Sequence, residues 1–136
     1  MRQAEDLIKM YTREEREIIK NNIKKIENYC KTEIVPLISD YDVIADCSEI
    51  RYRKSDGSAF KKTYFLKVCK DGTVIFGKGG SRYIITENPE PCEWNIYESL
   101  SAMEDLLIRW QTAKTKLLCE IKKQKTSKLK VLNFEI

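Results

Sequence analysis

The sequence contains no histidine, and this absence excludes many catalytic mechanisms and metal sites. Without an imidazole there can be no Ser-His-Asp or Cys-His nucleophile system, no histidine general base and no three-histidine zinc site. The chain also lacks the patterns G-x-S-x-G, G-x-x-x-x-G-K-[ST] and G-x-G-x-x-G. We therefore expect a binding protein and not an enzyme.

Cysteine pairs with metal-binding spacing are absent as well. The five cysteines are Cys30, Cys47, Cys69, Cys92 and Cys119. They are scattered, so a four-cysteine zinc site would need widely separated ligands, and we expect reduced thiols that are mostly buried. Asp40 and Asp42 could hold a hard cation, but two solvated acids at the start of a strand explain them more simply. We predict neither a metal nor a cofactor.

Long apolar runs are missing. No segment approaches the roughly 18 apolar residues of a membrane span, and the N-terminal region lacks the apolar core of a signal peptide. We therefore expect a cytoplasmic protein that does not bind membranes. The length predicts a single domain over residues 1–136. The net charge of +4 permits anionic partners without requiring them.

The first helix is the clearest element. Thr12 and Glu15 have the spacing of a capping box, in which each side chain binds the other residue's amide. Apolar residues then recur every three or four positions between residues 19 and 30. Pro36 cannot continue a helix, so this helix should end near residue 33 or 34. A short amphipathic segment is expected at residues 5–11.

A second long helix is predicted near the C-terminus. Either Ser99 or Ser101 can cap it, and a continuous apolar stripe runs over residues 100–121. A lysine-rich segment follows at residues 122–130, which a solvated helix end explains most simply. Residues 129–136 have the composition of a last strand.

The segments between the two helices predict an antiparallel meander. Strand-like stretches cover residues 43–52, 60–69, 74–76 and 83–85, with turns at 55–58 and 70–73. Side-chain parity changes near Ser48, which indicates a bulge or bend. Two prolines predict a loop at residues 87–95. The fold class is therefore α+β, with about four meander strands and a C-terminal strand packed on two long helices.

The stretch 76-FGKGGSRY-83 is the first candidate site. Successive glycine amides can form a concavity for an anion, to which Lys78 and Arg82 would add charge. Phe76 and Tyr83 flank the loop and could stack on a base. The simpler interpretation is a hairpin tip, in which Gly79 supplies a positive φ and the cations keep the tip soluble.

A second candidate is 105-DLLIRW-110 in the long C-terminal helix. Arg109 lies four residues after Asp105, so a helical ion pair is the simpler interpretation. The functional interpretation is that Arg109 and Trp110 together line a pocket.

A third candidate is a basic surface on the meander. Arg51 and Arg53 share one strand face and could form a patch with Lys61 and Lys62. A basic sheet with interleaved aromatic residues can bind single-stranded nucleic acid, although a solvated outer face explains the charges more simply.

The size and lysine-rich composition of the chain resemble those of small bacteriophage or prophage accessory proteins. The order of elements, with 76-FGKGGSRY-83 and 105-DLLIRW-110, is similar to that of phage anti-Thoeris proteins. The resemblance implies a viral protein acting in the host bacterial cytoplasm. Such a protein would sequester a cyclic ADP-ribose signal intact, between subunits of an oligomer, to evade antiviral defence. Other phage inhibitors, including anti-CRISPR proteins, share this general appearance.

Two function hypotheses follow. The first is a non-catalytic sponge for a nucleotide-like small molecule. Its predicted binding residues are Phe76, Lys78, Gly79, Arg82, Tyr83, Arg109 and Trp110. The alternative is an inhibitor that binds a host protein or nucleic acid through its basic surface. The long apolar helices also predict a homodimer or a higher homo-oligomer.

Overall fold

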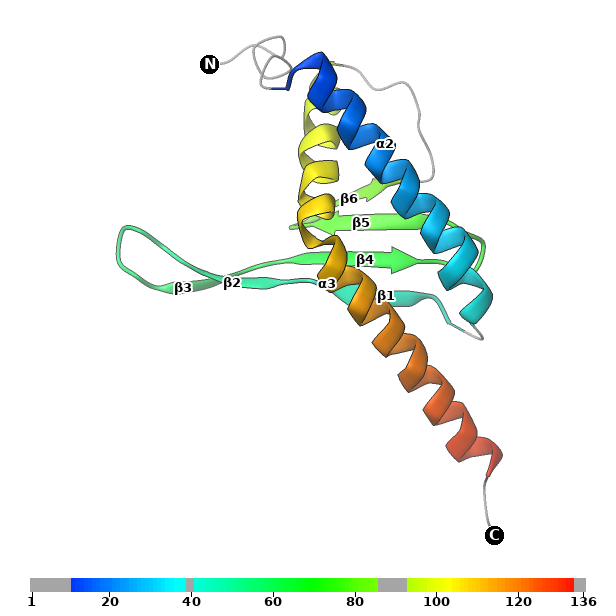
Figure 1. Cartoon of the computed structure of the whole chain (residues 1–136). Helices are drawn as coiled ribbons and strands as arrows, with labels where there is room; N and C mark the ends of the chain where they lie inside the picture. Colours follow the sequence, from blue (N-terminus) through cyan, green and yellow to red (C-terminus); the bar gives the residue numbers. More distant parts are fainter. Residues whose placement is uncertain (1–10, 39–40, 86–92, 134–136) are drawn as a thin grey trace.

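The computed structural model describes residues 11–38, 41–85 and 93–133. Two helices, α2 (Arg13–Tyr29) and α3 (Glu93–Leu132), lie on one side of a four-stranded antiparallel sheet. A separate two-stranded ribbon projects beyond the sheet (Figure 1). The α+β class predicted from the sequence is confirmed.

Helix α2 begins where its capping box predicts. Its α-helical part ends at Tyr29, before the predicted residue 33 or 34, and only a π-helical continuation reaches Ile34. The Thr12 side chain accepts a hydrogen bond from the Glu15 amide at 3.0 Å, and the Glu15 carboxylate accepts one from the Thr12 amide at 3.1 Å. At its C-terminal end the helix widens into a π-helical turn, η1 (Cys30–Ile34), followed by a 3-10 turn, η2 (Val35–Leu37). Pro36 lies in this last turn, where its missing N–H cannot extend the α-helical ladder.

The sheet has the strand order β1-β4-β5-β6, and every pair in it is antiparallel. Its strands are β1 (Val43–Asp46), β4 (Tyr64–Val68), β5 (Val74–Lys78) and β6 (Ser81–Ile84). The ribbon pairs β2 (Glu49–Tyr52) with β3 (Ala59–Lys62). The break between β1 and β2 falls at residues 47–48, so the bend predicted near Ser48 is confirmed. There the Asp46 carboxylate accepts a hydrogen bond from the Ser48 amide at 2.9 Å.

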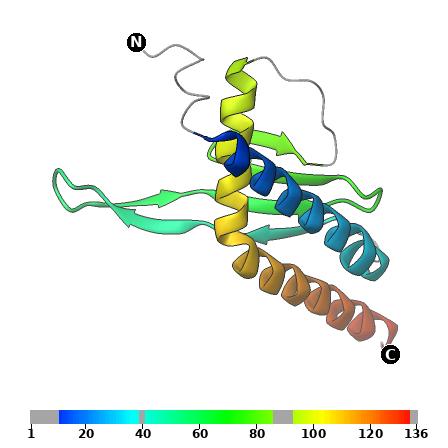
Figure 2. The same ribbon diagram turned by 45° about the horizontal axis from the view of Figure 1, so that its top comes forward.

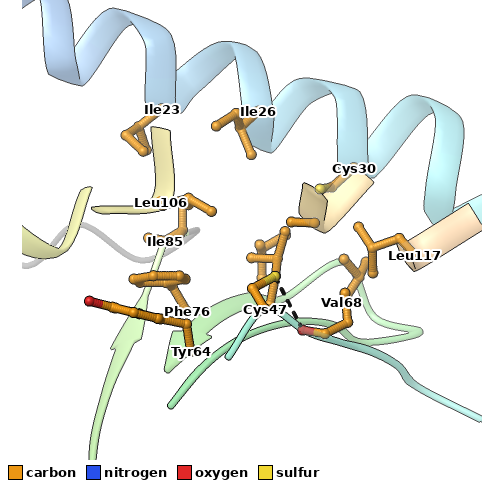
Figure 3. Close-up of a cluster of buried hydrophobic side chains, with 14 of the residues drawn as sticks. Ile23, Ile26, Cys30, Cys47, Tyr64, Val68, Phe76, Ile85, Leu106 and Leu117 are labelled. Atoms are coloured by element: carbon orange, nitrogen blue, oxygen red, sulfur yellow. Dashed lines mark hydrogen bonds between the residues drawn. The ribbon is translucent and has the colours of Figure 1, made fainter. Parts of the chain in front are cut away.

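The core lies between the inner face of the sheet and the two helices (Figure 3). Helix α2 supplies Ile23 and Ile26, and helix α3 supplies Leu106 and Leu117. The largest fully buried side chain from the sheet is Tyr64. This layered arrangement explains the sequence pattern, because one stripe of each helix and alternate residues of each strand are apolar.

Two predictions about the C-terminal half are wrong. Helix α3 is already formed at Glu93, so residues 93–95 are helical and not a loop, and the two candidate cap serines lie inside the helix. Residues 129–132 are the last turn of α3 and not a strand. Lysine, glutamine and leucine are good helix formers and no glycine or proline interrupts them, so the helix continues. Residues 5–10 of the amphipathic segment predicted at 5–11 lie outside the described part of the chain, and so do residues 134–136.

Candidate functional site

The glycine-rich stretch forms a hairpin turn between β5 and β6. Lys78 pairs with Ser81, so Gly79 and Gly80 form the tip. Gly79 has φ +59°, a conformation that side chains rarely adopt. Its amide already donates to the Thr63 carbonyl at 2.9 Å, and a side chain at either glycine would meet no atom within 4 Å. The tip is therefore open, and one of the amides proposed for an anion cradle is occupied.

The other predicted residues of this stretch do not converge. Phe76 is fully buried and stacks on Tyr64 with ring centroids 6.1 Å apart, so no ligand can reach its face. Arg82 is exposed on the outer face of the sheet, opposite Gly77. Tyr83 is half-buried against the core on the inner face. Neighbouring residues of a strand point to opposite faces, which separates Arg82 from Tyr83.

Lys78 and Arg109 belong to an internal ion-pair network, which we call the Arg109 network. The Lys78 Nζ lies 2.6 Å from Asp105 Oδ2, and Arg109 Nη1 lies 3.2 Å from Asp105 Oδ1. Arg109 Nη2 lies 3.1 Å from Glu49 Oε1, and Glu49 also binds Arg51 at 2.9 Å. The predicted pair of Asp105 and Arg109 is present, within a larger network that joins β5, α3 and β2.

Arg109 is held on aromatic surface as well as by charge. Its guanidinium carbon lies 3.6 Å from the centroid of the fully buried Tyr64 ring, and the residue is only 5% exposed. Burial alone would lower the pKa of Lys78, but its hydrogen bond to Asp105 raises that pKa above its ordinary value. The hydrogen bond from Arg51 lowers the pKa of Glu49. The cations of the network therefore already have anionic partners.

Trp110 lies in a different place, a hollow of about 310 Å³ between α2 and α3. We call this the interhelical hollow; it is lined by Asn22, Lys25, Ile26, Tyr29, Leu107 and Trp110. The rings of Tyr29 and Trp110 meet edge to face with centroids 5.4 Å apart. Lys114 places its ammonium 4.9 Å from the Tyr29 centroid. An aromatic wall with nearby lysines can take a flat anion. Tyr29 is not among the predicted site residues, because in the sequence it resembles an ordinary member of the helix stripe.

The projecting ribbon, residues 49–62, carries the third candidate; we call it the basic ribbon. Arg51 pairs with Phe60 in the register, which places Arg51, Arg53 and Lys62 on one face and Lys61 on the other. The predicted patch is therefore divided between two faces. Arg53 donates to the Ser58 Oγ at 2.9 Å, and its guanidinium lies 5.1 Å from the Phe60 centroid.

The second face of the basic ribbon is apolar at its centre. Ile50 is 62% exposed and Tyr52 is 69% exposed. The ribbon that carries them projects away from both described helices (Figure 2). Within the described part of the chain, Lys54 and Lys61 make no ion pair. The basic ribbon thus has available cations and an exposed aromatic side chain.

The end of helix α3 is a further basic surface. Its lysines are Lys122, Lys123, Lys125, Lys128 and Lys130, and all are exposed. Lys123 pairs with Glu120 at 3.2 Å. This end of the helix extends past the sheet, in a direction different from that of the basic ribbon (Figure 1).

The remaining chemistry of the described residues is sparse. Cys30, Cys47, Cys69 and Cys119 are free thiols, and burial raises the pKa of Cys30 to about 12. Among residues 11–38, 41–85 and 93–133, no group of three or more acids or cysteines is placed to hold a metal ion. None of the described helices has the length and apolarity needed to cross a membrane.

Comparisons with known proteins add no further assignment. No protein family, curated protein or solved structure matches the chain. The resemblance to anti-Thoeris proteins therefore stays a prediction from the sequence. The case for function depends on the geometry of the interhelical hollow, the basic ribbon and the lysine-rich end of α3.

Proposed function

We propose that this protein binds nucleic acid through the basic ribbon, without catalysis. The observation that carries the proposal is the form of this segment. It is a two-stranded ribbon whose five cations outnumber its two acids, and it extends clear of the body (Figure 1). A two-stranded β-ribbon fits the major groove of duplex DNA, and cations along it contact phosphates.

The distribution of ion pairs supports the basic ribbon over the other candidates. Glu49 already pairs with Arg51, so Arg53, Lys54, Lys61 and Lys62 are the cations left for phosphates. In contrast, Lys78 and Arg109 are tied to carboxylates inside the fold. Since each phosphate contact releases a counterion, four contacts predict a slope of about −3.6 for log K against log salt on duplex DNA.

Fluorescence anisotropy with a labelled duplex and a labelled single strand of the same sequence tests the proposal. We expect tight binding at low salt that weakens with the predicted slope. The double variant Lys54→Gln/Lys61→Gln should bind more weakly and reduce the magnitude of the slope by about 2. The matched control is Lys20→Gln/Lys24→Gln on exposed positions of α2, which removes the same net charge but should leave the slope unchanged.

The result also distinguishes the kind of nucleic acid. Preference for the duplex supports insertion of the basic ribbon into a groove. Preference for the single strand, lost in Tyr52→Ala, supports stacking of unpaired bases on the exposed ring. Equal losses in the ribbon variant and the α2 control would contradict the proposal, because binding would then reflect net charge alone.

A second candidate function is sequestration of a small nucleotide-like ligand of the cyclic ADP-ribose type. The interhelical hollow favours it, since Tyr29 and Trp110 offer aromatic surface beside Lys25 and Lys114. Of the predicted binding residues, only Trp110 lines this hollow. In this form the site does not use the glycine turn or the Arg109 network. Evasion of host antiviral defence is a prediction that comes from the resemblance alone.

A thermal-shift series against cyclic nucleotides, ADP-ribose isomers and NAD tests the second candidate. A ligand that binds the native state raises the melting temperature by mass action, and a sponge should return it intact. We expect Trp110→Ala to abolish the shift and Arg82→Ala, a remote exposed position, to preserve it. If no small ligand shifts the melting temperature, this candidate fails and the nucleic-acid proposal is unaffected.

A further inference from the structure

The sheet has a second face, opposite the helices, that no described element covers (Figures 1 and 2). We call it the outer face. It consists of Ile44, Asp46, Phe65, Lys67, Ile75, Gly77, Arg82 and Ile84. Ile44 is 50% exposed and Ile84 is 45% exposed, although both belong to a sheet whose other face is a closed core. An uncovered sheet face that carries exposed isoleucines is typical of an interaction surface.

The strand register arranges the outer face in two rows that cross the sheet. One row runs Asp46, Phe65, Gly77, Arg82, and the other runs Ile44, Lys67, Ile75, Ile84. The first row therefore has an acid at the β1 edge and a base at the β6 edge. The second row has an exposed isoleucine at each edge. If the β1 end of each row faces the β6 end of the same row in a second molecule, acid meets base in the first row and isoleucine meets isoleucine in the second.

We propose that a second copy of this chain packs on the outer face, around a twofold axis parallel to the strands. Such an axis reverses the order of strands but not their direction, so β1 lies over β6 of the second copy. Asp46 then meets Arg82 of the second copy, and Ile44 meets its Ile84. Because a twofold interface uses each contact twice, the dimer has two such ion pairs and two such apolar pairs.

The middle of the outer face is compatible with close packing. The Phe65 ring occupies the position that a side chain on Gly77 would fill, so no side chain of residue 77 rises above the sheet. Lys67 directs its ammonium towards Asp42, 3.9 Å away, which leaves its alkyl stem over the sheet. Two sheets can therefore approach to the usual spacing of about 10 Å.

The small size of the outer face predicts weak association. Strands of four or five residues in a four-stranded sheet give a face roughly 15 Å on each side, below the roughly 800 Å² per partner of a stable complex. We therefore expect a micromolar dissociation constant. This interface differs from the helix surface that the sequence suggested, because the apolar stripes of α2 and α3 are largely used in the core.

Analytical ultracentrifugation of the full chain, without nucleic acid, tests this inference independently of the proposed function. We expect dimers to form between low and high micromolar concentration. Asp46→Arg and Arg82→Asp should each weaken dimerisation by about tenfold, since each replaces two attractive pairs with repulsive ones. The double variant Asp46→Arg/Arg82→Asp should restore it. Ile108→Asp, at an exposed position on α3, should have no effect.

Circular dichroism melts show whether each variant is folded. Asp46→Arg also removes the hydrogen bond that the Asp46 carboxylate accepts from the Ser48 amide, which can disturb the fold. Arg82→Asp removes no such bond, so it tests the interface even where Asp46→Arg is unstable. A chain that remains monomeric throughout the concentration range would overturn the inference. So would a double variant that dimerises no better than the single variants, or dimers that depend on Ile108 and not on the outer face.

Discussion

Replacing Arg109 with alanine should destabilise the fold, because this side chain joins three elements. Arg109 binds Asp105 on α3 and Glu49 on β2, and it lies on the Tyr64 ring of β4. The variant loses both ion pairs and leaves a cavity against the ring. Breaking a buried pair typically costs about 3–5 kcal/mol. Here Asp105 keeps Lys78 and Glu49 keeps Arg51, so we expect a smaller loss of about 2–3 kcal/mol.

Urea denaturation measures this loss of unfolding free energy, and a thermal melt gives the matching change in melting temperature. A change of this size should lower the melting temperature by roughly 5–15 °C in a chain of this length. Arg109→Met retains much of the volume over Tyr64 and should recover part of the stability, although it lacks the charge. The control is Arg82→Ala, whose exposed side chain should change the unfolding free energy by less than about 0.5 kcal/mol.

The outcome separates a structural role from a binding role. If Arg109→Ala is as stable as the unmodified protein, the Arg109 network does not anchor these elements and the reasoning is refuted. If that variant also loses a small ligand, the sequence hypothesis that Arg109 belongs to a ligand site gains its first support. If Arg109→Met is less stable than the unmodified protein but binds the small ligand equally well, the role of Arg109 is structural.

Three further predictions follow from particular contacts. Gly77→Ala should lower the unfolding free energy by about 1–3 kcal/mol in urea melts, because a neighbouring ring occupies the space of the new methyl group. The hydrogen bond from Arg51 lowers the folded-state pKa of Glu49. The stability that ionised Glu49 contributes to the fold is therefore complete above the ordinary pKa of 4.5, and it is lost as the pH falls through the lower folded-state pKa. Glu49→Gln should flatten that acid decline in melts. In native protein, a thiol reagent should modify exposed Cys119 rapidly and buried Cys30 only after unfolding, so Cys119→Ser should remove one fast equivalent and Cys30→Ser none.

Elements with local signals could be predicted from the sequence. The capping box fixes the start of α2 through two reciprocal hydrogen bonds between residues three apart. The change of parity near Ser48 marks the point where the ribbon leaves the sheet. The start of α3 could not be predicted in the same way, because serine is a good cap but is also tolerated inside a helix. At residues 129–132, helical continuation prevailed over the weak strand preference of valine and leucine.

The predicted small-molecule site failed to assemble for a geometric reason. Residues adjacent in sequence were grouped together, but adjacency separates side chains in both kinds of element. Arg82 and Tyr83 alternate across the sheet, so they lie on opposite faces. Arg109 and Trp110 are about 100° apart around α3, so one enters the ion-pair network and the other enters the interhelical hollow. Predicting these positions requires the packing of the helix on the sheet, which no local pattern contains.

The Arg109 network also connects the body to the surface that we propose binds nucleic acid. Among the described residues, Arg109 is the one charged residue that is buried. One of its partners, Glu49, is the first residue of β2. The base of the basic ribbon is thus held by an ion pair to a buried arginine, while the cations nearer its turn have no carboxylate partner within the described part of the chain. A ribbon fixed at its base and free along its length keeps its direction without using the charges that would contact phosphates. By this argument Arg109→Met should weaken nucleic-acid binding without changing its salt slope, because the number of phosphate contacts is preserved while their alignment is not.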